Sequence, residues 1–396
     1  MINRLKYKNI ILIFLLIPFL CPRGFLEYFS FYKLFLTAWL YLSVGIIYIV
    51  AIAKLLTLKK IKINSFVGSM ILYFSIIIII TFLVRQSFSG ALQKLFATPA
   101  LCIFSVYYLK KNPLQIIKYT NNILIIIFVL NSTIFSPLFW PTYFRPISNH
   151  LLFIGHVQTA VQIGMLAILT AYIEYEVYNG NKKKYVLLMI LSYINMLMSF
   201  TSAAYISIIL LLLFKILGNF KIYGSIALEG RVYLSLYLLL NFIFFLIICA
   251  GKSSLEIAGF SLNGRGFIWA KAIESFFKSP IYGYGANGVL IKVFWSYWVG
   301  DGQGMNYMHN QILQILNDGG IILFAAFIYM LYIAMSTIDK LKGKKIRYQI
   351  STFIAIILIV MTFESVMEYF YFSYILCIVA YLPKLVQNRG ASRDEY

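Results

Sequence analysis

The chain has 396 residues, of which 61% are hydrophobic and only 12% are charged. A soluble globular protein is about half apolar and about a quarter charged, so this composition excludes an ordinary cytosolic globular protein. The formal net charge of +21 would suggest a nucleic-acid-binding protein if the basic residues formed a soluble patch. Here they separate long apolar segments instead, which indicates an integral membrane protein that does not bind nucleic acid.

Apolar segments suited to transmembrane helices recur along almost the whole chain. Such a helix needs roughly 20 mostly apolar residues to cross about 30 Å of hydrocarbon. The expected spans begin near residues 9, 34, 66, 91, 119, 152, 185, 203, 232, 310, 348 and 369. The sequence therefore predicts an all-α polytopic membrane protein with about twelve transmembrane helices, in which residues 1–396 form a single integral membrane domain.

The basic residues predict on which side of the membrane each connecting segment lies. Most of the 34 Lys and Arg residues fall in segments that are cytoplasmic if the N-terminus lies inside the cell. Because cytoplasmic loops carry an excess of Lys and Arg, we expect both termini to be cytoplasmic, in the inner (plasma) membrane.

Two outer loops stand out under this topology, one near residues 139–151 and a much longer one at residues 251–309. Loops longer than about 12–15 residues are uncommon and often functional. We therefore expect the chemistry of the protein in the large extracytoplasmic loop, residues 251–309.

A short amphipathic helix is predicted inside this loop, from Arg265 to Lys278. Four apolar residues recur at spacings of three and four and predict one apolar face, and the Ser-Pro pair that follows ends the helix. These residues are Phe267, Ala270, Ile273 and Phe277. Arg265 would lie at the helix N-terminus, which favours anions, so it is a candidate phosphate ligand. An ordinary loop arginine, ion-paired or extended toward water, explains it equally well.

His309 lies where the long loop meets the next apolar segment. A neutral imidazole can take a proton from a sugar hydroxyl, although an interfacial histidine bonded to the backbone is an equal alternative. Asp318 follows nine residues later and either pairs with a charged group or caps a helix end before Gly319 and Gly320.

Other ionisable residues lie near the outer ends of the predicted spans. Arg145, His150 and His156 could complete a site with Arg265 and His309, or they could belong to an ordinary interfacial loop. Glu364 and Glu368 lie one helical turn apart and could bind a cation or a basic partner, but a solvated pair is the simpler interpretation.

The motif order in the long loop resembles that of the O-antigen polymerase and O-antigen ligase superfamily. The pattern consists of Gly-Arg with a following Trp, then a Pro with two glycines, then His-Asn and a later Gly. In this chain these are Gly264-Arg265, Trp269, Pro280, Gly283, Gly285, His309-Asn310 and Gly320. The pattern departs from the family at Leu323, where the ligases prefer a small residue or Tyr, and at Thr201-Ser202-Ala203, which lacks a family arginine.

The resemblance implies a metal-independent membrane glycosyltransferase that needs no cofactor and no nucleotide sugar. Its substrate would be an undecaprenyl-pyrophosphate-linked oligosaccharide in the membrane lipid, with a chain-length regulator and a flippase as further partners. In this interpretation His309 is the catalytic base, and Arg265 and Arg145 hold the pyrophosphate. His150, His156, Asn310, Trp269 and Asp318 would support the site.

The favoured function is extracytoplasmic polymerisation of lipid-linked repeat units for capsule, exopolysaccharide or O-antigen. An O-antigen ligase that transfers glycan to a lipid A core is the alternative within the same class. A polysaccharide transporter or flippase is a rival, but transporters usually show repeat symmetry and interrupted helices at the membrane midplane. A non-catalytic membrane scaffold is the remaining rival, and it predicts that changes at His309 and Arg265 are silent.

Overall fold

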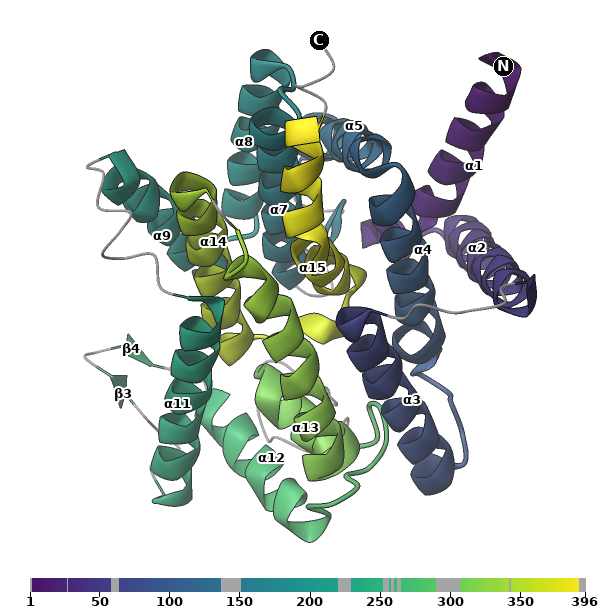
Figure 1. Cartoon of the computed structure of the whole chain (residues 1–396). Helices are drawn as coiled ribbons and strands as arrows, with labels where there is room; N and C mark the ends of the chain where they lie inside the picture. Colours follow the sequence, from purple (N-terminus) through teal and green to yellow (C-terminus); the bar gives the residue numbers. More distant parts are fainter. Residues whose placement is uncertain are drawn as a thin grey trace. The chain divides into compact units, whose positions relative to one another are not determined.

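The computed structural model describes residues 2–26, 28–57, 64–136, 151–219, 229–251, 256–257, 260–261, 265–289, 307–341 and 343–391. The described chain divides into two compact units. The first unit comprises residues 1–62, 100–222 and 369–396, and the second comprises residues 63–99 and 223–368. Both are helical, and the strands within the described ranges are two short hairpins (Figure 1).

The prediction of an all-α polytopic membrane protein is confirmed. Each predicted span overlaps a helix, and eight helices within the described residues are long and apolar enough to cross a membrane. These are α2 (Ser30–Thr57), α3 (Ser65–Arg85), α5 (Pro113–Ser132), α7 (Val157–Tyr172) with the π-helix η3 (Ile173–Val177), α11 (Gly230–Cys249), α13 (Gln311–Ile338), α14 (Lys344–Phe363) and α15 (Phe370–Ala391). The other predicted spans fall on α1 (Ile2–Leu20), α4 (Thr98–Lys111), α8 (Lys182–Leu197) and α9 (Ser202–Asn219), which are shorter or less apolar. The expected number of twelve spans therefore stays a prediction.

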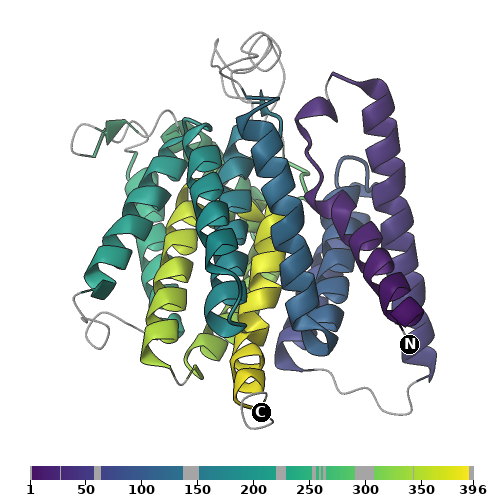
Figure 2. The ribbon, with the colours of Figure 1, turned by 90° about the horizontal axis from the view of Figure 1, so that it is seen from above.

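Helix α7 is the central helix of the first unit, because it is buried on nearly every side against α5, α8 and α15 (Figure 2). Its N-terminal end follows directly on a hairpin of β1 (Leu151–Leu152) and β2 (Gly155–His156). His156 begins the helix by accepting a hydrogen bond from the Gln158 N–H. The structure thus gives this histidine a helix-capping role.

The second unit is built around α13, which packs against α3, α11, α14 and α12 (Arg265–Lys278). Two short elements complete the unit, the π-helix η2 (Gln93–Ala97) and the 3-10 helix η4 (Val366–Glu368). A hairpin of β3 (Glu256–Ile257) and β4 (Phe260–Ser261) also belongs to it. Figure 1 shows α12 beside one end of α11 and of α13.

Helix α13 is broken at Gly319 and Gly320, and the loop after α12 fills the break. Gly320 has φ 61° and ψ −161°, a conformation essentially restricted to glycine. In a regular helix the Ile321 N–H would bond to the Asn317 carbonyl. Here Ile321 donates to the Pro280 carbonyl at 2.9 Å, and the Asn317 carbonyl accepts from the Tyr284 N–H at 2.8 Å. The loop therefore satisfies both backbone groups that the break releases.

The glycines of the predicted motif allow this close packing. A Cβ atom at Gly320 would lie 2.2 Å from the Ile281 carbonyl oxygen, and one at Gly283 would lie 2.5 Å from that of Asn317. Gly283 also has a positive φ of 62°. These glycines consequently position the loop against α13.

The amphipathic helix α12 has the predicted bounds, but the predicted apolar face is only half right, since Ala270 and Ile273 pack on the protein and the two phenylalanines do not. Phe267 and Phe277 are 48% and 60% exposed. The face that packs on the protein is formed by Ile268, Trp269, Ala272 and Ile273. Spacings of three and four also occur along the border of a helix face, which is why the two phenylalanines misled the assignment.

Candidate functional site

The second unit brings Arg265 and His309 to one buried carboxylate, Glu364. The Arg265 Nη2 atom donates to Glu364 Oε1 at 2.6 Å, and His309 Nδ1 lies 3.3 Å from Glu364 Oε2. The Glu364 side chain is only 3% exposed, whereas those of Arg265 and His309 are 22% and 17% exposed. An imidazole and a guanidinium that reach water therefore share a buried anionic partner.

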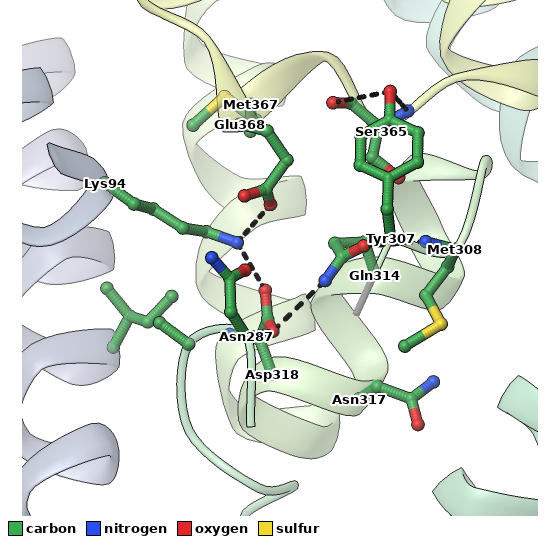
Figure 3. A network of polar contacts seen from close by, with 12 residues as sticks. Lys94, Asn287, Tyr307, Met308, Gln314, Asn317, Asp318, Ser365, Met367 and Glu368 are labelled. Carbon is green, nitrogen blue, oxygen red and sulfur yellow. Dashed lines mark hydrogen bonds and ion pairs between the residues drawn. The ribbon is translucent and has the colours of Figure 1, made fainter. Parts of the chain in front are cut away.

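Tyr307 completes this cluster. Its hydroxyl donates to Glu364 Oε2 at 3.1 Å. The same hydroxyl accepts from the Ser365 N–H at 3.1 Å (Figure 3). The edge of one ring faces the other, since the centroids of Tyr307 and His309 are 4.6 Å apart at an interplanar angle of 84°. Glu364 is thus held by three side chains, and the His309 ring is held on one side by an aromatic ring.

Trp269 and Asn310, both predicted as supporting residues, hold the backbone around His309. The buried Trp269 indole donates to the Met308 carbonyl at 3.1 Å. The Asn310 side chain begins α13 by accepting from the Leu313 N–H, and its amide nitrogen donates to Asn241 Oδ1 at 2.8 Å and to the Thr362 carbonyl at 2.9 Å. Both residues therefore have structural bonds that position the histidine segment.

A second buried charged cluster lies in the same unit. The Lys94 ammonium bonds Asp318 Oδ2 at 2.5 Å and also pairs with Glu368 (Figure 3). The side chains of the three residues are at most 12% exposed. Burial raises the pKa of the Glu368 carboxyl, and the Lys94 ammonium opposes that rise. Of the two alternatives for Asp318, the structure shows the charged partner.

The interpretation of Glu364 and Glu368 as a solvated pair is wrong. The turn at residues 364–368 folds both carboxylates into the protein, and each meets a different cation. The sequence spacing did not show these partners, because Arg265 and Lys94 are about 100 and 270 residues away in the chain. A lysine inside a predicted apolar span was the available signal for Lys94, since such a residue usually has a buried partner.

The structure does not place every residue predicted from the shorter outer loop. Arg145 and His150 lie outside the described residues, as does Gly264. His156 belongs to the first unit, where it caps α7. The described site therefore consists of Arg265, His309, Glu364 and Tyr307.

An apolar cavity lies among α11, α12 and α13. Its volume is about 450 Å³, within the range of ligand pockets of about 300–1,000 Å³. Its walls include Phe244, Phe245 and Trp269, and its polar lining residues are Asn241 and Asn310. Asn310, which follows His309 directly, thus also lines this apolar cavity.

Residues 187–328 match the family model described as O-antigen ligase. This segment is therefore similar to members of the O-antigen polymerase and ligase superfamily. The match confirms the resemblance seen in the motifs, and it includes Arg265, His309 and Asp318. Lys94 and Glu364 lie outside the matched range. A search of the curated proteins found no match.

Members of the O-antigen ligase family are glycosyltransferase-like enzymes that act as polymerases or ligases. The family implies a lipid-linked oligosaccharide as substrate and a location in membrane lipid, in agreement with the apolar helices of this chain.

Proposed function

We propose that the protein polymerises lipid-linked oligosaccharide repeat units on the outer face of the inner membrane. The observation that carries this proposal is the contact of His309 and Arg265 with the same carboxylate, Glu364. It supplies a candidate proton acceptor and a candidate anion ligand within one small region, as transfer from a lipid pyrophosphate requires.

In the proposed reaction a hydroxyl of the acceptor sugar attacks the anomeric carbon of the donor. Its proton passes to His309, the new glycosidic bond forms, and the bond between the anomeric carbon and the pyrophosphate oxygen breaks. The undecaprenyl pyrophosphate leaves with the bonding electrons. A single displacement of this kind inverts the anomeric configuration.

Glu364 is suited to orient both His309 and Arg265 for this reaction. When the imidazole donates its Nδ1 proton to this carboxylate, Nε2 carries the lone pair that accepts a proton. The carboxylate also stabilises the imidazolium that forms. Arg265 has five N–H donors, and the contact with Glu364 uses one nitrogen, so the guanidinium can also bind a pyrophosphate oxygen. The apolar cavity offers room for a segment of the lipid chain.

The test is deletion of the gene followed by complementation and gel analysis of surface polysaccharide. We expect His309→Ala and Arg265→Ala to leave single repeat units. The His309 change should lower polymer formation at least a hundredfold, the lower end of general-base contributions of about 10²–10⁴. Lys271→Ala is the matched control, because Lys271 lies exposed on α12 in a surface pair with Glu274. Polymer of normal length from His309→Ala would contradict the proposed base.

The family description favours a ligase as the second candidate. The same deletion separates the two functions. Single repeat units on the lipid carrier indicate a missing polymerase, whereas full-length chains retained on that carrier indicate a missing ligase.

A further inference from the structure

His309 has an unusual backbone conformation for a residue that must aim a side chain. Its φ is 49°, in the left-handed region that non-glycine residues seldom adopt. Such a conformation persists where surrounding contacts hold it. The direction of the imidazole therefore depends on the groups that hold the peptides on either side of His309.

Both polar groups of Met308 are held by buried side chains. Trp269 donates to the Met308 carbonyl, and the Met308 N–H donates to Gln314 Oε1 at 3.0 Å. On the other side of His309, the Asn310 carbonyl accepts from the Ser365 hydroxyl at 3.3 Å. Among these residues, Gln314 also forms a hydrogen bond with a residue outside the site, Asp318.

Gln314 links the histidine segment to the Lys94 cluster (Figure 3). The side chain is fully buried, and its Nε2 donates to Asp318 Oδ1 at 3.3 Å. Asp318 is itself fixed by the Lys94 ammonium and by the Asn287 N–H at 2.9 Å. An ionised carboxylate only accepts hydrogen bonds, so the amide nitrogen must face Asp318 and the amide oxygen must face Met308.

We propose that Gln314 is a positioning residue, which passes the fixed orientation of the Lys94–Asp318–Glu368 cluster to the peptide before His309. It thereby holds the imidazole in its reactive direction without touching substrate. This inference rests on the proposed function, because it takes His309 as the base. It explains why the buried ion cluster and the peptide before His309 are joined by an amide, which can accept at one end and donate at the other.

The first test compares two buried glutamines on the same helix. Gln311 is also fully buried, one turn earlier, but its Oε1 accepts from the Met367 N–H instead of from the histidine segment. Purified protein in lipid nanodiscs would be assayed with the lipid-linked repeat unit that a deletion strain accumulates. We expect Gln314→Met to lower kcat by tenfold or more with KM changed less than threefold, since a misplacement of about 1 Å can cost about a hundredfold. Gln311→Met should lower thermal stability similarly while kcat per folded molecule stays within about threefold.

The second test uses Gln314→Glu, which keeps the shape and the oxygen that accepts from Met308 but loses the donor to Asp318. The charged and titratable groups around the position are Asp318 on α13, Lys94 on η2, Glu368 on η4 and Tyr73 on α3, with His309 and Glu364 on the side of the site. Protonation of the introduced carboxyl restores a donor. We therefore expect the ratio of variant to wild-type kcat to rise as pH falls, although a histidine base loses activity in that direction.

The outcomes separate this inference from the proposed function. If Gln314→Met and Gln314→Glu keep kcat within twofold of wild type while His309→Ala is inactive, the base role stands and the positioning role is wrong. If His309→Ala keeps its turnover, the proposed function fails, whatever the Gln314 variants show. If Gln314→Met does not fold, the pH dependence of Gln314→Glu decides, and a ratio that stays flat between pH 5 and pH 8 overturns the inference.

Discussion

The two carboxylate oxygens of Glu364 contact three side chains of the site, Arg265, Tyr307 and His309. A buried carboxylate with this many donors is held in one orientation, so it can fix the tautomer of the imidazole. In the proposed reaction its negative charge would also compensate the positive charge that His309 gains when it takes a proton. The position therefore needs a charge as well as a hydrogen-bond acceptor.

A change of Glu364→Gln separates the two requirements. The amide keeps the size and one acceptor but cannot compensate the imidazolium, so we expect kcat to fall by about tenfold to a hundredfold, the range known for carboxylates that orient metal-bound histidines. Steady-state assays with the lipid-linked repeat unit measure this change. Glu274→Gln is the control, because Glu274 is half-exposed on α12 between Lys271 and Lys278. Equal kcat values for the two variants would show that Glu364 has no orienting role.

The sequence alone predicted two of the four residues of the described site. Arg265 and His309 were identified because the charge pattern placed both in one outer loop and because their motifs resemble a family. Glu364 and Tyr307 were missed as partners, since a contact across 99 residues depends on how α12 and α14 pack. Residue type and spacing predict the structure of a single helix, but they do not predict which residues of two different helices come into contact.

At the scale of elements, charges and glycines replace apolar packing where α13 is interrupted. The break at Gly319 and Gly320 follows Asp318 directly. Lys94 on η2 forms ion pairs with this aspartate and with Glu368 on η4. Three elements distant in sequence are thus joined by one cation. A helix end before Gly319 and Gly320 was one of the two alternatives given for Asp318, and the sequence left it open because two glycines in an apolar run are also compatible with a continuous helix.

Lys94→Met should destabilise the protein strongly. It leaves Asp318 and Glu368 buried without a counter-charge, and breaking a buried ion pair from one side costs about 3–5 kcal/mol. A thermal-unfolding measurement in detergent checks this expectation. Lys271→Met, which removes an exposed partner of Glu274, should change stability by less than about 1 kcal/mol.

The pH dependence of the Lys94→Met variant gives a second measurement. Without the ammonium, burial raises the pKa of the Glu368 carboxyl further, since the opposing influence of Lys94 is gone. A carboxyl with a raised folded-state pKa contributes stability at low pH that is lost as pH rises through that pKa. The deficit relative to wild type should therefore shrink toward acid pH. A deficit that is the same at pH 5 and pH 8 would show that lost charge compensation is not its cause.

At the scale of the whole chain, the exposed apolar side chains indicate that lipid surrounds the helices. Large apolar side chains are widely exposed on the helices, for example Phe31 at 81%, Leu34 at 70% and Leu56 at 82% on α2. A soluble protein seldom exposes apolar patches of this extent, whereas hydrocarbon chains of a bilayer cover them without cost. Composition was sufficient to predict this property, because it depends on the sum of the residues and not on a particular contact.

The orientation of the chain in the membrane can be tested with cysteine labelling. The proposed topology puts Cys249, exposed at the end of α11, and Lys278 of α12 outside, and Lys183 at the start of α8 inside. In a variant that lacks Cys21, Cys102 and Cys377, a membrane-impermeant maleimide should modify Cys249 in intact spheroplasts. In a chain that also lacks Cys249, Lys278→Cys should react in the same way, and Lys183→Cys should react after permeabilisation alone. The reverse pattern would place His309 at the cytosolic face, where the lipid-linked donor of an outer-face polymerase is not presented, and would exclude the proposed reaction.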